Sequence, residues 1–192
     1  MRSTLRVTAA LCWCVFLGAQ APNPQANGLQ PDWDVGVILQ EMSAHGARLL
    51  PLLEQLDAKG WAEKGASETY AAQLQSSKDQ VRTLTDEAKA LARNPERLSA
   101  GLELYFRIQA VDQMIGSLLE GTRKYQDAAL ADRLASLAAE NGANRGRFQV
   151  YLVNLAAQRE QECAVMDREA QRCRGILATQ PPPPRPTTGR KK

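Results

Sequence analysis

The chain contains little of what catalytic and metal sites are built from. It has 1 histidine and 4 cysteines. It also lacks a Gly-rich phosphate loop, a Cys-x-x-Cys pair, a haem-attachment motif, a His-Glu-x-x-His zinc motif and a Gly-x-Ser-x-Gly nucleophile turn. A serine nucleophile would need His45 as its base, and the apolar spacing described below predicts that His45 is buried. These absences favour a protein that is not an enzyme, and we expect no cofactor.

Aromatic residues are scarce as well, at 5% of the chain, whereas alanine is frequent. Such a composition can build long helices but offers little that favours a sheet. The formal net charge of +3 is unevenly distributed, because 6 of the 24 basic residues lie in the two terminal segments, 1–21 and 181–192. The remainder has 18 basic residues against 21 acidic ones. The global charge therefore gives no argument for nucleic-acid binding.

Residues 1–21 have the pattern of a secretory signal peptide. A basic start is followed by an apolar run over residues 7–17 and then by small residues. The run is shorter than the roughly 20 residues that a membrane-spanning helix needs. Cleavage is expected after Ala19 or after Ala21, and the second bond is the poorer substrate because Pro22 follows it. We expect an exported protein, either periplasmic or secreted.

Two further segments are expected to lie outside the folded domain. Residues 22–31 are rich in Pro, Asn and Gln and are predicted to form a flexible leader. Residues 179–192 are predicted to form a disordered, basic tail, in which four consecutive prolines favour an extended spacer. The tail is expected to make at most weak contact with an anionic envelope surface. Residues 32–178 are then the predicted helical bundle domain.

Within 32–178, apolar residues recur at alternating intervals of three and four positions, which predicts amphipathic helices packed side by side. Helices are expected from Asp32 or Asp34, either of which can cap the first one, to Leu56, over 67–93 and over 94–126. The region from 127 to about 175 is expected to be either one kinked helix or two helices that break near 141–145. The single helix is favoured, because the stripe of apolar residues (the seam) keeps the same spacing on both sides of the glycines. Short connections make consecutive helices antiparallel. The predicted fold is an all-α, antiparallel up-down bundle of four to five long helices.

The helix over 94–126 is the predicted centre of the bundle, with Asn94 as its N-cap and Pro95 at its first position. Its seam residues are Leu104, Ile108, Val111, Ile115 and Leu118. Further apolar residues widen this face and suggest cover on more than one side, namely Leu98, Leu102, Phe106 and Met114.

The other predicted seams have the same spacing. The first helix contributes Ile38, Met42, His45, Leu49, Leu52 and Leu56. The second contributes Tyr70, Leu74, Ser77, Val81, Leu84, Ala88 and Leu91. The last region contributes Leu130, Leu134, Leu137, Asn141, Asn144, Phe148, Tyr151 and Leu155, and then Cys163, Met166, Ala170, Cys173 and Leu177. Pro51 is expected to kink or split the first helix, and residues 57–66 are expected to be a connection from which Trp61 packs against the end of the bundle.

His45 and Glu41 lie one helical turn apart and share a helix face. They could supply two ligands of a metal site whose remaining ligands would be carboxylates or Cys163 and Cys173 from another helix. The favoured interpretation is a seam histidine hydrogen-bonded to a carbonyl or carboxylate.

Asn141 and Asn144 interrupt the last apolar seam. Polar side chains at such positions must find partners or face water. They are expected either to cap a helix break, which is the favoured interpretation, or to line a small polar pocket.

The cysteines raise a separate question. Cys12 and Cys14 lie in the predicted signal peptide, and each follows a bulky residue, unlike a cysteine that receives a lipid. Cys163 and Cys173 are ten residues apart, about 15 Å on a continuous helix, which is too far for a disulfide between them. Two buried free thiols are the favoured prediction. The alternatives are an intermolecular disulfide or an internal disulfide through an unpredicted turn.

Together these features predict an exported, non-enzymatic helical bundle that acts as an interaction or structural module in a cell envelope. Its partner would be an unknown protein or a second copy of the chain. The alternative is a ligand- or metal-binding helical protein that uses Glu41, His45 and the Cys163/Cys173 seam.

Overall fold

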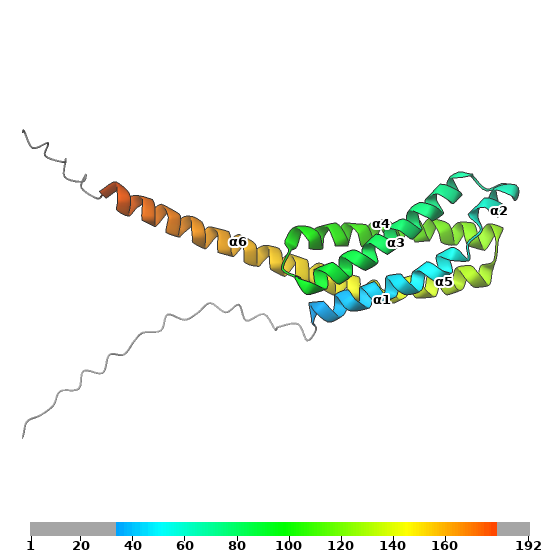
Figure 1. Ribbon diagram of the computed structural model, residues 1–192, viewed down its shortest axis with the longest axis horizontal. Helices are drawn as coiled ribbons and strands as arrows, with labels where there is room; N and C mark the ends of the chain where they lie inside the picture. The colour runs from blue at the N-terminus through cyan, green and yellow to red at the C-terminus, as the bar shows by residue number, and fades with distance from the viewer. Residues whose placement is uncertain (1–33, 180–192) are drawn as a thin grey trace, which may run out of the picture. The chain divides into compact units, whose positions relative to one another are not determined.

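The computed structural model describes residues 34–179, and every regular element in that range is an α-helix. The helices are α1 (Val35–Glu54), α2 (Ala58–Glu63), α3 (Thr69–Arg93), α4 (Leu98–Tyr125), α5 (Ala128–Glu140) and α6 (Gly142–Thr179). In Figure 1, α1, α3 and α4 form three rods, and α5 with the first part of α6 forms the fourth. The predicted all-α bundle is confirmed. The predicted signal peptide, leader and nearly all of the predicted tail lie outside the described residues.

The centre of the core is α4, as its spacing predicts. All five of its seam residues are exposed by 2% or less. Burying one such side chain is worth roughly 1.5–3 kcal/mol. The wider apolar face is only partly covered: Leu98 and Met114 pack against the core as predicted, whereas Leu102 and Phe106 are 40% and 62% exposed. Helix α4 therefore buries one stripe and leaves its outer flank in solvent.

Helix α1 begins at the second of the two expected caps, where the Asp34 carboxylate accepts a 2.7 Å hydrogen bond from the amide of Gly36. Pro51 lies inside α1 and does not split it, since the helix continues to Glu54. The proline is exposed, so the carbonyl that loses its helical partner can bond to water. Near this end Leu53 is fully buried, whereas the predicted Leu52 is only partly buried against the core; the predicted Leu56 is buried.

The segment predicted as a simple connection contains the short helix α2. Asp57 caps it by accepting from the amide of Gly60 at 3.0 Å. Trp61 is 1% exposed, which confirms that it packs against the bundle. Its indole Nε1 donates to Gln126 Oε1 at 2.9 Å, and Gln126 Nε2 in turn donates to the carbonyl of Gln55 at 2.8 Å. One glutamine therefore fastens the α1–α2 link to the α4–α5 turn.

The junction between α3 and α4 differs from the prediction. Asn94 is not the N-cap of α4 but the C-cap of α3, with an extended φ of −147°. The proline at position 95 explains this, because it disfavours helical geometry in the residue before it. Helix α4 starts only at Leu98, behind a turn and without a side-chain cap.

The fourth rod is interrupted at Asn141, so the favoured single helix was wrong and the alternative of two helices holds. Asp127 caps α5 by accepting from the amides of Ala129 and Leu130 at 3.0 and 3.1 Å. Helix α6 then begins at Gly142, one residue after the break. The break is short enough that α5 and α6 continue the same rod.

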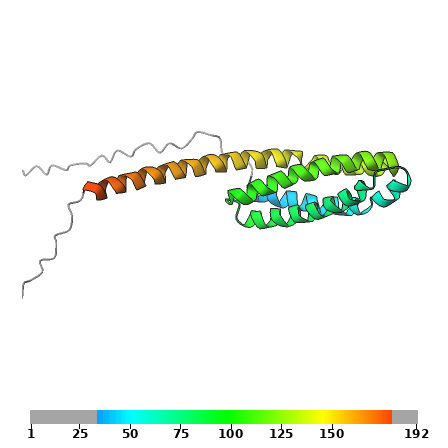
Figure 2. The same cartoon turned by 90° about the horizontal axis from the view of Figure 1, so that it is seen from above.

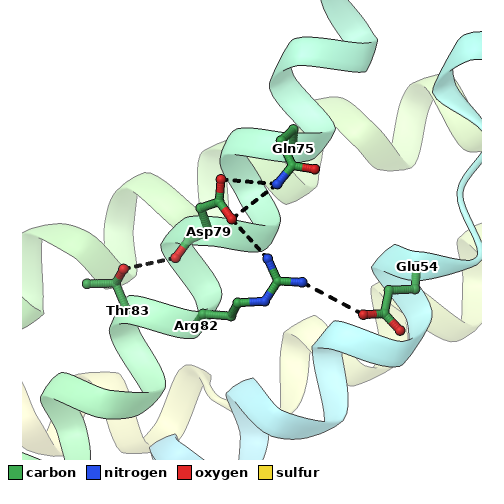
Figure 3. Close-up of polar contacts among 5 residues, drawn as sticks. All are labelled: Glu54, Gln75, Asp79, Arg82 and Thr83. Atoms are coloured by element: carbon green, nitrogen blue, oxygen red, sulfur yellow. Dashed lines mark hydrogen bonds and ion pairs between the residues drawn. The ribbon is translucent and has the colours of Figure 1, made fainter.

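Polar contacts on the solvent side link α1 to α3. Figure 3 shows Arg82 between Asp79, at 2.9 Å on its own helix, and Glu54 of α1, at 3.8 Å. Gln75 donates to the same Asp79 carboxylate at 3.1 Å. These groups are exposed, so each ion pair is worth at most about 1 kcal/mol. They help to orient the rods, whereas the buried seams supply the stability.

Candidate functional site

The first candidate site is a polar cleft between α1 and the junction of α5 with α6. It has a volume of about 340 Å³. Its lining consists of Glu41, Ala44, His45, Arg48, Glu140, Asn141 and Asn144. Asn141 is the C-cap of α5, so the favoured interpretation of a capped helix break holds. The alternative, a small polar pocket lined by Asn141 and Asn144, is present as well.

The rim of this cleft is held by two contacts between helices. Asn144 Nδ2 donates to Glu41 Oε2 at 2.9 Å, and Arg48 Nη1 lies 2.8 Å from Glu140 Oε2. Both contacts join α1 to the fourth rod, so every charged group at the rim already has a partner. The rim contacts position the helices on either side of the opening.

The inner wall has the unsatisfied groups. His45 and Asn141 are 6% and 7% exposed. Within residues 34–179, His45 Nδ1 and Asn141 Oδ1 are buried and have no hydrogen-bond partner. The prediction that a carbonyl or carboxylate bonds to His45 is wrong for this nitrogen. An unmet buried polar group costs about 1–3 kcal/mol, so both atoms favour any molecule that can donate a hydrogen bond to them.

The electrostatics of the cleft favour the neutral form of His45. Burial lowers the pKa of His45, Arg48 lowers it further, and Glu140 opposes the shift. A cavity of about 10 Å³ adjoins the inner wall and is lined in part by His45, Asn141 and Asp112. Burial raises the pKa of Asp112 more than its ion pair with Arg145 lowers it.

The predicted metal set is not brought together. Glu41 and His45 share the cleft, but Cys163 and Cys173 are exposed on the distal part of α6. In the described range no cluster of three or more His, Cys, Asp or Glu side chains could hold a metal ion. No local sequence pattern points to Arg48 or Glu140, because their pairing depends on how α5 packs against α1.

The second candidate site is the distal half of α6. Helix α6 runs on past the other helices (Figure 2), and every residue from 163 to 179 is exposed. The prediction of buried thiols is therefore wrong, because both cysteines face solvent. The apolar seam at these positions is not covered by any described residue.

The uncovered seam continues the buried face of the same helix. Five turns of an α-helix take 18 residues, so residues 18 apart point in the same direction. Met166 follows the buried Phe148 by that interval, and Cys173 follows the buried Leu155. The stripe that packs into the bundle upstream is therefore the stripe that lies bare downstream, with Met166 and Leu177 exposed by 61% and 67%.

We name this bare stripe the distal face. It consists of Cys163, Met166, Ala170, Cys173 and Leu177. A shallow hollow of about 530 Å³ lies beside it and is lined by residues 158–166 of α6 itself. One helix cannot enclose a ligand, so the hollow is an open surface suited to another helix rather than a small-molecule pocket.

Comparisons with known proteins do not assign this chain to a family. No family model, curated protein or solved structure matches the chain. Among the described helices, none is long and apolar enough to cross a membrane.

Proposed function

We propose that the chain is an exported, non-enzymatic interaction module of a cell envelope that docks through the distal face of α6. The observation that carries the proposal is the five-turn repeat from Phe148 to Met166, which makes the distal face an uncovered continuation of a core-packing stripe. Apolar residues at alternating intervals of three and four form the seam that another helix fills. Export is supported by the signal-peptide pattern of residues 1–21.

The docking proposal is tested by chemical cross-linking in envelope fractions of cells that express the tagged chain. Met166→Glu places a charge in the distal face, and Ala164→Glu places the same charge on the opposite, exposed side of α6. We expect cross-linked species to be lost in the first variant and kept in the second. Equal cross-linking of both variants would contradict the proposal.

Export is tested separately by the mass of the purified chain. Cleavage after Ala19 or Ala21 gives a chain that begins at Gln20 or Pro22. A chain that keeps residues 1–19 and stays in the cytoplasm would contradict export. It would not bear on the proposed docking through the distal face.

A second candidate function is the binding of a small molecule in the polar cleft. The observation that favours it is the pair of unpartnered atoms on the inner wall, His45 Nδ1 and Asn141 Oδ1. A neutral imidazole nitrogen and an amide oxygen can both accept hydrogen bonds, and two carboxylates lie at the rim. The chemistry that complements this set is a primary ammonium group, which offers three donors and a positive charge.

The chain suits a direct test of this second function, because its one histidine gives a unique imidazole NMR signal. Ethylammonium chloride is titrated into the protein, with tetramethylammonium chloride at equal ionic strength as the control without donors. We expect a saturable shift of the His45 signal with ethylammonium alone, and its loss in Asn141→Ala. Identical responses to both salts would contradict ligand binding in the cleft.

A further inference from the structure

The distal face needs an occupant, and the structure restricts what that occupant can be. The bare seam runs from Cys163 to Leu177, about 21 Å at 1.5 Å per residue. Upstream, the same face of α6 is filled by the bundle, where Phe148, Leu152 and Leu155 are buried. A partner helix can therefore lie along the distal face only if it does not continue upstream on that face.

Resting on the proposed docking function, we infer that the occupant is a second copy of this chain whose α6 runs antiparallel to the first. A parallel copy is excluded by the bundle, because the upstream half of its α6 would run into the helices that cover Leu152 and Leu155. In the antiparallel arrangement each copy places its bundle beyond the C-terminal end of the other copy's seam. The contact is then the same patch on both copies, which is how twofold dimers form.

The central apolar side chains of the distal face are complementary in size in this arrangement. When Ala170 lies opposite Met166 of the second copy, Cys163 lies opposite Cys173 of the second copy. A large side chain thus faces a small one, which suits interdigitated packing. The flanking Glu160 is placed beside Arg174 of the second copy, and this pair occurs twice by symmetry, whereas Asp167 is placed beside its own equivalent at the centre of the contact and weakens the association. Four of the five seam positions face one another in this register, and Leu177 lies opposite Arg159 of the second copy. A shift by one heptad also pairs four positions but leaves Cys163 outside the contact, so cross-linking of Cys163 to Cys173 distinguishes the two registers.

The contact is short, so the association is expected to be weak and dependent on concentration unless it is made covalent. The opposed thiols allow that step. Two thiols form a disulfide when they pass two electrons and two protons to a protein disulfide by thiol–disulfide exchange, as the oxidising compartments of exported proteins permit. The intermolecular disulfide predicted from the sequence is therefore expected to join Cys163 of one copy to Cys173 of the other.

The test uses a short bismaleimide, which joins two nearby thiols without an oxidant. The purified processed chain, which lacks Cys12 and Cys14, is compared with Cys163→Ser and Cys173→Ser. We expect a cross-linked dimer of the unmutated chain and none of either variant alone. An equal mixture of the two variants should restore the dimer, because each supplies one of the two opposed thiols. Met166→Glu is expected to reduce the yield roughly tenfold or more, and Ala164→Glu to leave it unchanged.

The other outcomes overturn the inference in distinguishable ways. Cross-linking within each single-cysteine variant, with no gain on mixing, would indicate a parallel pair. No cross-linked dimer of the purified chain would exclude the second copy. If envelope cross-linking still depends on Met166 in that case, the docking function stands with a different occupant. If it does not, the docking function fails as well.

Discussion

At the scale of single residues, one close approach in the bundle brings α4 against the rigid ring of Trp61. A Cβ atom added at Gly121 would lie 2.8 Å from Cζ3 of Trp61 and 3.1 Å from Cε1 of Tyr70. Both rings are rigid and packed edge to face, with centroids 5.5 Å apart. Glycine is therefore required at position 121 because the rings of Trp61 and Tyr70 approach the backbone closely, and not because of its backbone conformation.

The first prediction compares two glycines of α4. Gly121→Ala is expected to lower the free energy of unfolding by about 1–2 kcal/mol, because overpacking costs more than the helix propensity returns. Gly116→Ala is the matched control, since nothing lies within 4 Å of its added Cβ. It should raise stability by roughly 0.5–1 kcal/mol. Urea unfolding measures both, and shifts of the same sign would contradict the packing at Trp61.

The second prediction concerns the pH dependence of stability. The pKa of His45 is lowered from 6.5 in the folded protein, so the unfolded chain binds the proton more tightly. Stability is therefore complete above about pH 7 and decreases as pH falls through 6.5 toward the folded pKa. Asp112, with a raised pKa, acts in the opposite direction at lower pH.

The contribution of His45 is isolated by comparison with His45→Gln, which cannot titrate. Thermal unfolding from pH 7 to pH 5 should show a greater loss of stability in the unmutated protein than in the variant. Parallel curves would contradict the burial of His45, and so would an imidazole NMR titration with a midpoint above 6.5.

At the scale of elements, the connections decide how the rods are aligned. Gln126 accepts from the amide of Asp57 and from the indole of Trp61, both at 2.9 Å, and donates to the carbonyl of Gln55. These bonds span about seventy residues of sequence and cross from one turn to another. They fix the end of the bundle at which α2 lies.

The third prediction tests this fastening. Gln126→Ala should lower the free energy of unfolding by about 2–3 kcal/mol, because it leaves the buried indole of Trp61 without a partner. Gln55→Ala removes an exposed contact within one helix, from Gln55 Nε2 to the carbonyl of Pro51, and should change stability by less than about 0.5 kcal/mol. Equal effects in urea unfolding would show that Gln126 does not join the two turns.

Some features of the helices could be predicted from the sequence, and others could not. Spacing predicted the α4 seam correctly, since burial of a repeated apolar stripe follows from helix geometry alone. Asn94 was misassigned because one residue can either cap a helix or end the previous one, and only Pro95 decides between them. The pairing of Arg48 with Glu140 depends on the packing of α5, so no local pattern predicts it.

At the scale of the whole molecule, the apolar spacing of α6 was predicted from the sequence, but the solvent exposure of its distal half was not. The spacing through Cys163 and Leu177 continues the phase of the buried stripe upstream, yet the predicted burial at these positions is wrong, because the spacing does not reveal where the covering helices end. That limit depends on the lengths of α1 and α4 relative to α6, which only the packed bundle fixes. The exposure of both cysteines follows from this difference in length.

The most direct test of the central claim is amide hydrogen exchange of the processed, reduced chain at two concentrations, high and low. Residues 104–118 of α4 should be strongly protected at both, because the bundle covers them whatever occupies the distal face. Residues 163–177 should gain protection at the high concentration in the unmutated chain and in Ala164→Glu, but not in Met166→Glu. Distal protection that does not depend on concentration, or that is equal in all three chains, would contradict docking of a second copy on the distal face.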